Sequence, residues 1–214
     1  MLPDPAAVAA RGAAVLAERA RAAVAARGAF SMALSGGSTP WAMLEVLAAE
    51  AVPWEHVTVL QVDERVAPAG DEQRNLTHLR AALPADVALL PMPVEAGDLE
   101  AAAEAYARLL PRPLDLVHLG LGADGHTASL VPGDGVLAVR DRLVAATAPY
   151  QGHRRLTLTY PTLDHARFAL WLVTGAVKAE ALARLLAGDP ALPATHVGTP
   201  EQLLLVDRAA AEAT

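Results

Sequence analysis

Short apolar runs alternate along the chain with longer segments in which apolar residues recur at helical spacing. The short runs predict strands over residues 30–34, 57–62, 116–120, 156–160, 168–174 and 203–206. Nearly continuous apolar strands are typical of parallel sheets that are buried on both faces. Their alternation with helices favours an α/β fold: a doubly wound, mostly parallel sheet with helices on both faces.

Helices are expected between the strands, over residues 5–27, 41–49, 99–110 and 176–187. Asp4 and Asp98 precede two of them and can accept hydrogen bonds from the N–H groups of a first turn. Pro5 suits the first helical position, and Gly28 and Gly188 can end a helix in the left-handed conformation. Local signals thus set both ends of the opening helix.

Length and composition indicate one ordinary globular domain over residues 1–214. The chain has 214 residues, of which 53% are hydrophobic and 19% charged, with no repeat and no low-complexity linker. Such a chain buries roughly 70% of its unfolded surface, so its core needs no metal or disulfide. The absence of cysteine excludes thiolate metal sites, cysteine nucleophiles and disulfides.

The net charge and the length of the apolar runs indicate which partners the protein does not bind. A formal net charge of −7 argues against a nucleic-acid surface, which would show a basic stripe. The N-terminus lacks a basic segment followed by an apolar one, and the apolar runs are too short to cross a membrane. We therefore expect a cytoplasmic enzyme without nucleic-acid or membrane partners, in which an anionic substrate needs a local cluster of positive charge.

A glycine-rich turn, residues 35–40, follows the first strand and precedes a helix. Gly36 and Gly37 let the backbone approach a ligand closely. Ser38 and Thr39 supply hydroxyls where a helix begins with unpaired N–H groups, which predicts an anion site. The alternative is a plain turn with Thr39 as N-cap and the following proline in the first helical position. The turn has neither the Walker pattern nor the dinucleotide spacing, so neither ATP nor NAD is indicated.

The charged run Asp63-Glu64-Arg65 comes at the end of the strand predicted over residues 57–62. Carboxylates accept hydrogen bonds from sugar hydroxyls, and a guanidinium binds anions with two donors. A solvated surface cluster is the alternative, because charged residues are mostly exposed. Ligands of open α/β sheets bind beyond the carboxyl ends of the strands, so the position favours a ligand-binding role for Asp63 and Arg65.

A second glycine-rich loop, residues 122–133, follows the strand over residues 116–120 and carries Asp124 and His126. Neutral imidazole can take a proton from water near physiological pH, and a neighbouring carboxylate can fix its tautomer. We therefore expect His126 to act as a general base with Asp124 as its helper. The spacing alone does not establish that the two side chains touch. His118, inside the strand, is expected to be a core histidine bonded to a neighbour.

Two further cations are candidates for the same site. Lys178 lies in the first turn of the helix predicted over residues 176–187, where a lysine is unfavourable against the helix dipole unless an anion is bound. Arg155 opens the strand over residues 156–160. It is the weaker candidate, because an arginine at a strand end is usually solvated.

In order and spacing, these segments resemble the 6-phosphogluconolactonase family across nearly the whole chain. The matching segments are 35–40, 63–65 with Asn75 downstream, 122–133, 155–158 and 175–178. The resemblance implies a Rossmann-like fold and hydrolysis of 6-phospho-D-glucono-1,5-lactone to 6-phospho-D-gluconate in the oxidative pentose phosphate pathway, a reaction that needs no metal or cofactor.

On this hypothesis, His126 activates water and Asp124 orients the imidazole. The substrate and its phosphate are then bound by the charged run, the two further cations and the glycine turn, that is, by Asp63, Arg65, Arg155, Lys178, Gly36, Gly37, Ser38 and Thr39. We expect a monomer or a small homo-oligomer whose partner is the small-molecule lactone.

Two alternatives differ from this hypothesis in chemistry. The aminosugar-6-phosphate isomerase/deaminase family also resembles the chain at the glycine turn, the Asp63–Glu64 pair and residues 124–126. Its pattern places a glutamate five residues after the histidine, where this chain has Val131. A non-catalytic sugar-phosphate sensor of related fold is the other alternative. We expect an enzyme rather than a sensor, because residues 1–214 show no helix-turn-helix segment or basic arm and a sensor does not need both Asp124 and His126.

Overall fold

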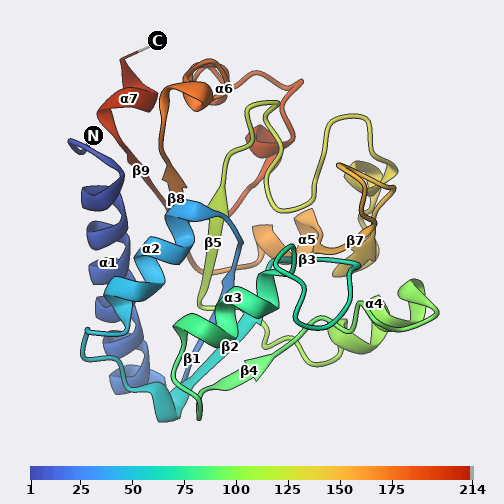
Figure 1. Ribbon diagram of the computed structural model, residues 1–214, viewed down its shortest axis with the longest axis horizontal. Helices are drawn as coiled ribbons and strands as arrows, with labels where there is room; N and C mark the ends of the chain where they lie inside the picture. The colour runs from blue at the N-terminus through green and yellow to red at the C-terminus, as the bar shows by residue number, and fades with distance from the viewer. Residues whose placement is uncertain (213–214) are drawn as a thin grey trace.

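A six-stranded parallel sheet forms the centre of the computed structural model, which describes residues 1–212 (Figure 1). From one edge to the other, its strands are β4 (Ala88–Leu90), β2 (Val57–Gln61), β1 (Phe30–Leu34), β5 (Leu116–Gly120), β8 (Ala169–Val173) and β9 (Gln202–Val206). Every neighbouring pair is parallel. The predicted doubly wound sheet is confirmed, and β4 is the strand that the apolar pattern does not predict.

Helices cover both faces of this sheet. On one face lie α1 (Pro5–Arg27), α2 (Ser38–Leu47) and α3 (Asn75–Ala82). On the other lie α4 (Leu99–Ala107), α5 (Tyr160–Asp164), α6 (Ala179–Leu186) and α7 (Arg208–Ala211). Phe30, Met32 and Leu34 of β1 join the first apolar cluster, whereas Ala33 joins the second. Because successive side chains of a strand point to opposite faces, burial on both faces makes the whole strand apolar.

The helix ends follow the local signals in part. Asp4 Oδ1 accepts from the Ala7 N–H at 2.8 Å, and Gly28, with φ of 78°, ends α1 as predicted. Asp98 caps α4 as predicted, but the helix ends three residues before the expected Leu110. The helix predicted over residues 176–187 is divided into a 3₁₀ turn, η3 (Ala176–Lys178), and α6.

A second, three-stranded antiparallel sheet stands beside the main one. It consists of β3 (Asp63–Arg65), β7 (Arg155–Leu158) and β6 (Val144–Ala146). The strand predicted over residues 156–160 thus forms as β7 but belongs to this smaller sheet, because β3 and β6 pair with it on its two edges. In the β3–β7 register, Arg65 is paired with Arg155. The remaining short elements are the 3₁₀ turns η1 (Trp54–His56), η2 (Gly135–Ala138) and η4 (Pro193–His196).

The strand order reverses between β1 and β5. From β1 the chain moves outward to β2 and β4, and it then returns to β5 on the other side of β1 before continuing to β8 and β9. The loops that leave β1 and β5 therefore diverge, and in open α/β sheets the resulting crevice is where ligands bind. These two loops are the predicted glycine turn and the loop that carries His126.

Candidate active site

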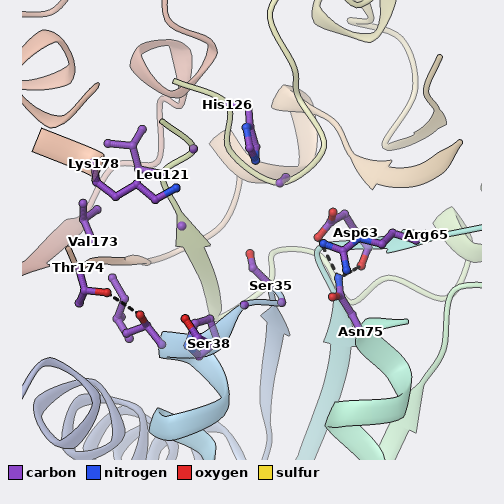
Figure 2. Close-up of a pocket in the computed structure, with 18 of the residues that line it drawn as sticks. Ser35, Ser38, Asp63, Arg65, Asn75, Leu121, His126, Val173, Thr174 and Lys178 are labelled. Atoms are coloured by element: carbon purple, nitrogen blue, oxygen red, sulfur yellow. Dashed lines mark hydrogen bonds between the residues drawn. The ribbon is translucent and has the colours of Figure 1, made fainter. Parts of the chain in front are cut away.

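A pocket of about 240 Å³ opens at the carboxyl ends of β1, β2, β5 and β8. Figure 2 shows Lys178 and Thr174 on one side of it, Asp63, Arg65 and Asn75 on the other, and His126 above Ser35. The structure brings together every residue that the sequence predicts for the site. All of them line the pocket except Asp124, which contacts it through His126. The reversal of strand order explains this convergence, because loops from distant parts of the chain meet there.

The glycine turn presents an open helix N-terminus to the pocket. Helix α2 begins at Ser38 with Gly37 as its N-cap, and no side chain caps its first turn. The Thr39 hydroxyl instead bonds the Thr174 hydroxyl at 2.6 Å. The alternative of a plain turn capped by Thr39 is therefore wrong. The N–H groups of the first turn and the positive end of the helix dipole favour an anion at this position.

Gly36 lies so close to the Asn75 side chain that only a glycine fits at this position. A Cβ atom at Gly36 would lie 1.9 Å from Asn75 Oδ1, a distance that no side chain can occupy. The Asn75 amide in turn donates to the Asp63 carbonyl oxygen at 3.0 Å. The glycine turn is therefore packed directly against the other wall of the pocket.

In the charged run after β2, Glu64 lies in the protein interior, whereas Asp63 and Arg65 line the pocket. Glu64 is fully buried, and its carboxylate accepts from the N–H groups of Asn75 and Leu76 at 2.8 Å each, which caps α3. It also forms an ion pair with the buried Arg74 at 3.3 Å. The alternative of a solvated surface cluster is thus wrong. Glu64 does not line the pocket, whereas Asp63 and Arg65 do.

Arg155 is buried rather than solvated, contrary to the expectation for an arginine at a strand end. It is 4% exposed, and its Nη1 donates to Ser129 Oγ at 3.3 Å, while Ser129 donates to Asp63 Oδ2 at 2.6 Å. Burial lowers the pKa of Arg155, although the Asp63 charge opposes this effect. Burial also raises the pKa of Asp63, against the hydrogen bond from Ser129 and the charge of Arg155. Asp63 therefore positions Arg155 through Ser129, a residue that the sequence patterns do not single out.

Two other cations are open to a ligand. Arg65 donates to the Gln73 carbonyl oxygen at 2.7 Å and pairs with no carboxylate within residues 1–212. In the same described range, the Lys178 ammonium has no ion-pair or side-chain hydrogen-bond partner. Lys178 ends η3 and is the residue before α6, so it lies at a helix start as predicted, although its own turn is 3₁₀. In a chain with a net charge of −7, cations without an ion-pair partner create a local attraction for an anion.

Asp124 and His126 are in direct contact. His126 Nδ1 lies 2.5 Å from Asp124 Oδ1, and the His126 backbone N–H donates to the same oxygen at 3.2 Å. The turn that holds them is tight, because a Cβ atom at Gly122 would lie 2.1 Å from His126 Nδ1. The His126 side chain is 25% exposed and the Asp124 side chain 38%, so both are accessible to water.

The electrostatics of this pair fix the role of each ring nitrogen. Partial burial disfavours ionisation of Asp124, but the charge and hydrogen bonds of His126 and the hydrogen bond from Tyr150 outweigh it and lower the Asp124 pKa. The carboxylate is therefore ionised at neutral pH and can only accept, so Nδ1 carries the proton. The other nitrogen, Nε2, is left as the basic one.

Tyr150 completes this cluster, and no sequence pattern points to it. Its hydroxyl donates to Asp124 Oδ2 at 3.0 Å, and its ring meets the His126 ring edge-on with centroids 5.5 Å apart. It lies in the hairpin between β6 and β7, 26 residues beyond Asp124. Only the pairing of these short strands brings it to the loop after β5.

His118 is a core histidine, as predicted. It is fully buried on β5, where its Nδ1 accepts the Ser35 N–H at 3.4 Å, and burial lowers its pKa to about 4. The ring is therefore neutral at physiological pH. It supports the start of the glycine turn and takes no part in the pocket.

Within residues 1–212, no group of three or more histidine, aspartate or glutamate side chains could hold a metal ion. In the same described range, no helix has the length and apolar character needed to cross a membrane.

Comparisons with known proteins identify the family of this chain. The family model described as glucosamine-6-phosphate isomerases/6-phosphogluconolactonase matches residues 3–206. A 6-phosphogluconolactonase of Synechocystis sp. is 38% identical, with 89% of this chain and 87% of that protein covered. A 6-phosphogluconolactonase of Mycobacterium tuberculosis is 39% identical with the same two coverages, 89% and 87%.

Solved structures show the same fold. The 6-phosphogluconolactonase of Trypanosoma cruzi superposes with a TM-score of 0.88 at 27% identity, over 99% of this chain and 94% of that one. A monomeric glucosamine-6-phosphate deaminase superposes with a TM-score of 0.86 at 19% identity, over 99% and 98% of the two chains, a likeness of fold alone. The chain belongs to the family of glucosamine-6-phosphate isomerases and 6-phosphogluconolactonases.

Proposed function

We propose that this protein hydrolyses 6-phospho-D-glucono-1,5-lactone to 6-phospho-D-gluconate, in the oxidative pentose phosphate pathway. The observation that carries the proposal is the 2.5 Å contact between Asp124 and His126, since His126 lines a pocket that also holds three cations and an uncapped helix N-terminus. A base beside an anion site is what the hydrolysis of a phosphorylated lactone requires. Relatives named 6-phosphogluconolactonase, 38% and 39% identical to this chain, support the same activity.

The isomerase/deaminase reaction has less support. The position at which that family's pattern has a glutamate is Val131 here, which is 7% exposed and does not line the pocket. No carboxylate is therefore available at this position to open an aminosugar ring. A pure sensor is also disfavoured, because binding alone does not need an ionised carboxylate held against a histidine.

We assign the substrate phosphate to the N-terminus of α2. There the N–H groups of Ser38 and Thr39 and the positive helix end favour an anion, and Lys178 adds a full charge to the same pocket. Arg65 and Arg155 are assigned to the sugar end of the substrate. Their guanidinium groups can donate to ring hydroxyls and oppose the negative charge that develops at the carbonyl.

In the chemical step, His126 Nε2 takes a proton from a water whose oxygen attacks the lactone carbon C1. The tetrahedral intermediate collapses, the bond from C1 to the ring oxygen breaks, and His126 returns the proton to that oxygen. The product acid then loses its own proton to solvent. Asp124 stabilises the imidazolium formed between the two proton transfers, and holding the water in place removes much of the entropic cost of attack.

The test is loss of lactone followed by NMR, with 6-phosphogluconolactone generated in situ. We expect the His126→Ala variant to lose about two to four orders of magnitude in rate relative to the wild type, after subtraction of spontaneous opening in a blank. A variant as fast as the wild type would overturn the assignment of the base. Tight binding without turnover by the wild type would indicate a sensor, and ammonia release from glucosamine-6-phosphate a deaminase.

A further inference from the structure

Tyr150 flanks the turn of the hairpin between β6 and β7. The Tyr150 N–H donates to the His153 carbonyl oxygen at 2.9 Å, and the His153 N–H donates to the Tyr150 carbonyl oxygen at 3.2 Å. These two bonds close a two-residue turn over Gln151 and Gly152. Both turn residues have positive φ, 50° and 84°, the pattern of the type I′ turns that match the twist of a hairpin. A positive φ is unusual for a glutamine, and the two backbone hydrogen bonds with His153 hold this turn and with it the Tyr150 backbone.

The hydrogen bonds of Tyr150 give its hydroxyl a direction. Gln151 Nε2 donates to Tyr150 Oη at 3.3 Å, and Oη lies 3.0 Å from Asp124 Oδ2. An ionised carboxylate only accepts, so the hydroxyl proton points at Oδ2. Burial and the neighbouring Asp124 charge both raise the Tyr150 pKa, which keeps this proton in place at neutral pH.

The ring of Tyr150 contacts both sides of the site. One edge meets His126 at 5.5 Å with an interplanar angle of 67°. The guanidinium of Arg155 lies over the ring at 5.1 Å, and Arg155 Nη2 donates to the Tyr150 carbonyl oxygen at 3.4 Å. Asp124, His126 and Arg155 are thus the charged or titratable groups that face Tyr150, and Asp63 and Arg65 lie beyond Arg155.

We propose that Tyr150 is a positioning residue for the Asp124–His126 pair. By holding Oδ2, its hydroxyl keeps Oδ1 aimed at His126 Nδ1, which maintains the tautomer with a basic Nε2. Asp124 needs such a restraint because its side chain is 38% exposed and water competes for its oxygens. The inference rests on the proposed function only in that the pair is taken to be catalytic.

The test is the Tyr150→Phe variant, which keeps the ring against His126 and Arg155 and removes only the hydroxyl. We expect kcat for lactone hydrolysis to fall roughly tenfold, the equivalent of about 1.4 kcal/mol, with little change in KM. The acid limb of the kcat/KM profile should move to higher pH. The reason is that the Asp124 carboxylate, once it has lost the hydrogen bond from the Tyr150 hydroxyl, stabilises the protonated His126 ring more strongly.

A second readout needs no substrate. Long-range ¹H–¹⁵N NMR spectra of the histidine rings report which nitrogen carries the proton. The wild type should show His126 protonated at Nδ1 at neutral pH, and the variant should show a mixture of tautomers with faster exchange of the Nδ1 proton.

Tyr160→Phe is a matched control outside the pocket. The Tyr160 hydroxyl donates to the Pro193 carbonyl oxygen at 2.9 Å, Arg140 lies over its ring at 5.1 Å, and His196 meets it edge-on at 6.1 Å. This variant also loses a tyrosine hydroxyl beside an arginine and a histidine, but at a buried position outside the pocket. We therefore expect kcat, the pH profile and the His126 tautomer to stay as in the wild type.

Tyr150→Phe with wild-type kcat, pH profile and tautomer would overturn the inference. A fall in kcat without any change in tautomer or pH profile would overturn it as well, because the hydroxyl would then act by another route. A wild type that does not hydrolyse the lactone refutes the proposed function instead, and the NMR comparison still decides whether Tyr150 controls the pair.

Discussion

Replacing Asp124 by asparagine keeps the shape of the side chain but removes a charge and one acceptor. Asp124 accepts at both oxygens, from His126 at Oδ1 and from Tyr150 at Oδ2. An amide offers one oxygen and a donating NH₂ group. If the amide oxygen stays with Tyr150, the NH₂ group faces Nδ1 and selects the tautomer whose Nε2 is protonated and cannot act as a base. If the oxygen stays with Nδ1, the imidazolium loses its negative partner.

The size of the effect follows from the contact that is lost. A hydrogen bond to a charged group contributes about 1.5–3 kcal/mol, which corresponds to roughly 10- to 200-fold in rate. The loss reaches roughly 10⁴-fold where such an aspartate is buried. Because the Asp124 side chain is 38% exposed, water replaces part of the interaction. We therefore expect kcat to fall about 10²-fold for Asp124→Asn, with little change in KM because Asp124 does not line the pocket.

The assay is the initial rate of lactone loss by NMR over a range of substrate concentrations, corrected for the blank. Asp86→Asn, which alters an exposed aspartate in the turn before β4, is the control for a change in charge alone and should match the wild type. An Asp124→Asn variant with kcat within about threefold of the wild type would refute the reasoning, because the loss of charge and acceptor must exceed that factor.

Two further predictions concern the two walls of the pocket. Lys178→Ala should raise KM for the lactone about tenfold or more while kcat changes much less, because an unpaired cation is lost from the anion site; a fall in kcat at constant KM would contradict a phosphate-binding role. The difference in the free energy of unfolding between Asp63→Asn and the wild type should shift in favour of the variant as the pH rises above about 4. Burial raises the Asp63 pKa in the folded protein, so the wild type loses stability as the pH rises through that folded pKa, whereas an amide does not titrate. Thermal unfolding of both proteins at acidic and neutral pH measures this, and a stability difference that is independent of pH would contradict it.

Local signals are sufficient for the main sheet and for the opening helix. The inner strands β1, β2, β5 and β8 are buried on both faces, so each reads as an apolar run, whereas the edge strand β4 has only three residues. Asp4 and Gly28 act on the N–H and carbonyl groups next to them, which is why both ends of α1 follow from the sequence.

The second sheet could not be predicted in the same way. Its strands β3 and β6 have three residues each, too few to show a period, and β3 pairs with β7 across a long stretch of chain. That pairing buries Arg155 beside Ser129 and Asp63, although an arginine at a strand end is usually solvated. It also turns Glu64 inward to cap α3.

The sequence by itself determined which loops carry the site, because glycine turns and charged residues follow apolar strands and the carboxyl ends of parallel strands share one edge of a sheet. Only the tertiary structure decided which side chains meet. Loop geometry and long-range strand pairing bring together three pairs of side chains: Asp124 with His126, Thr39 with Thr174, and Tyr150 with Asp124. The physical reason is that backbone capping and side-chain periodicity act over a few residues, whereas contacts between loops are fixed by the packing of the whole sheet.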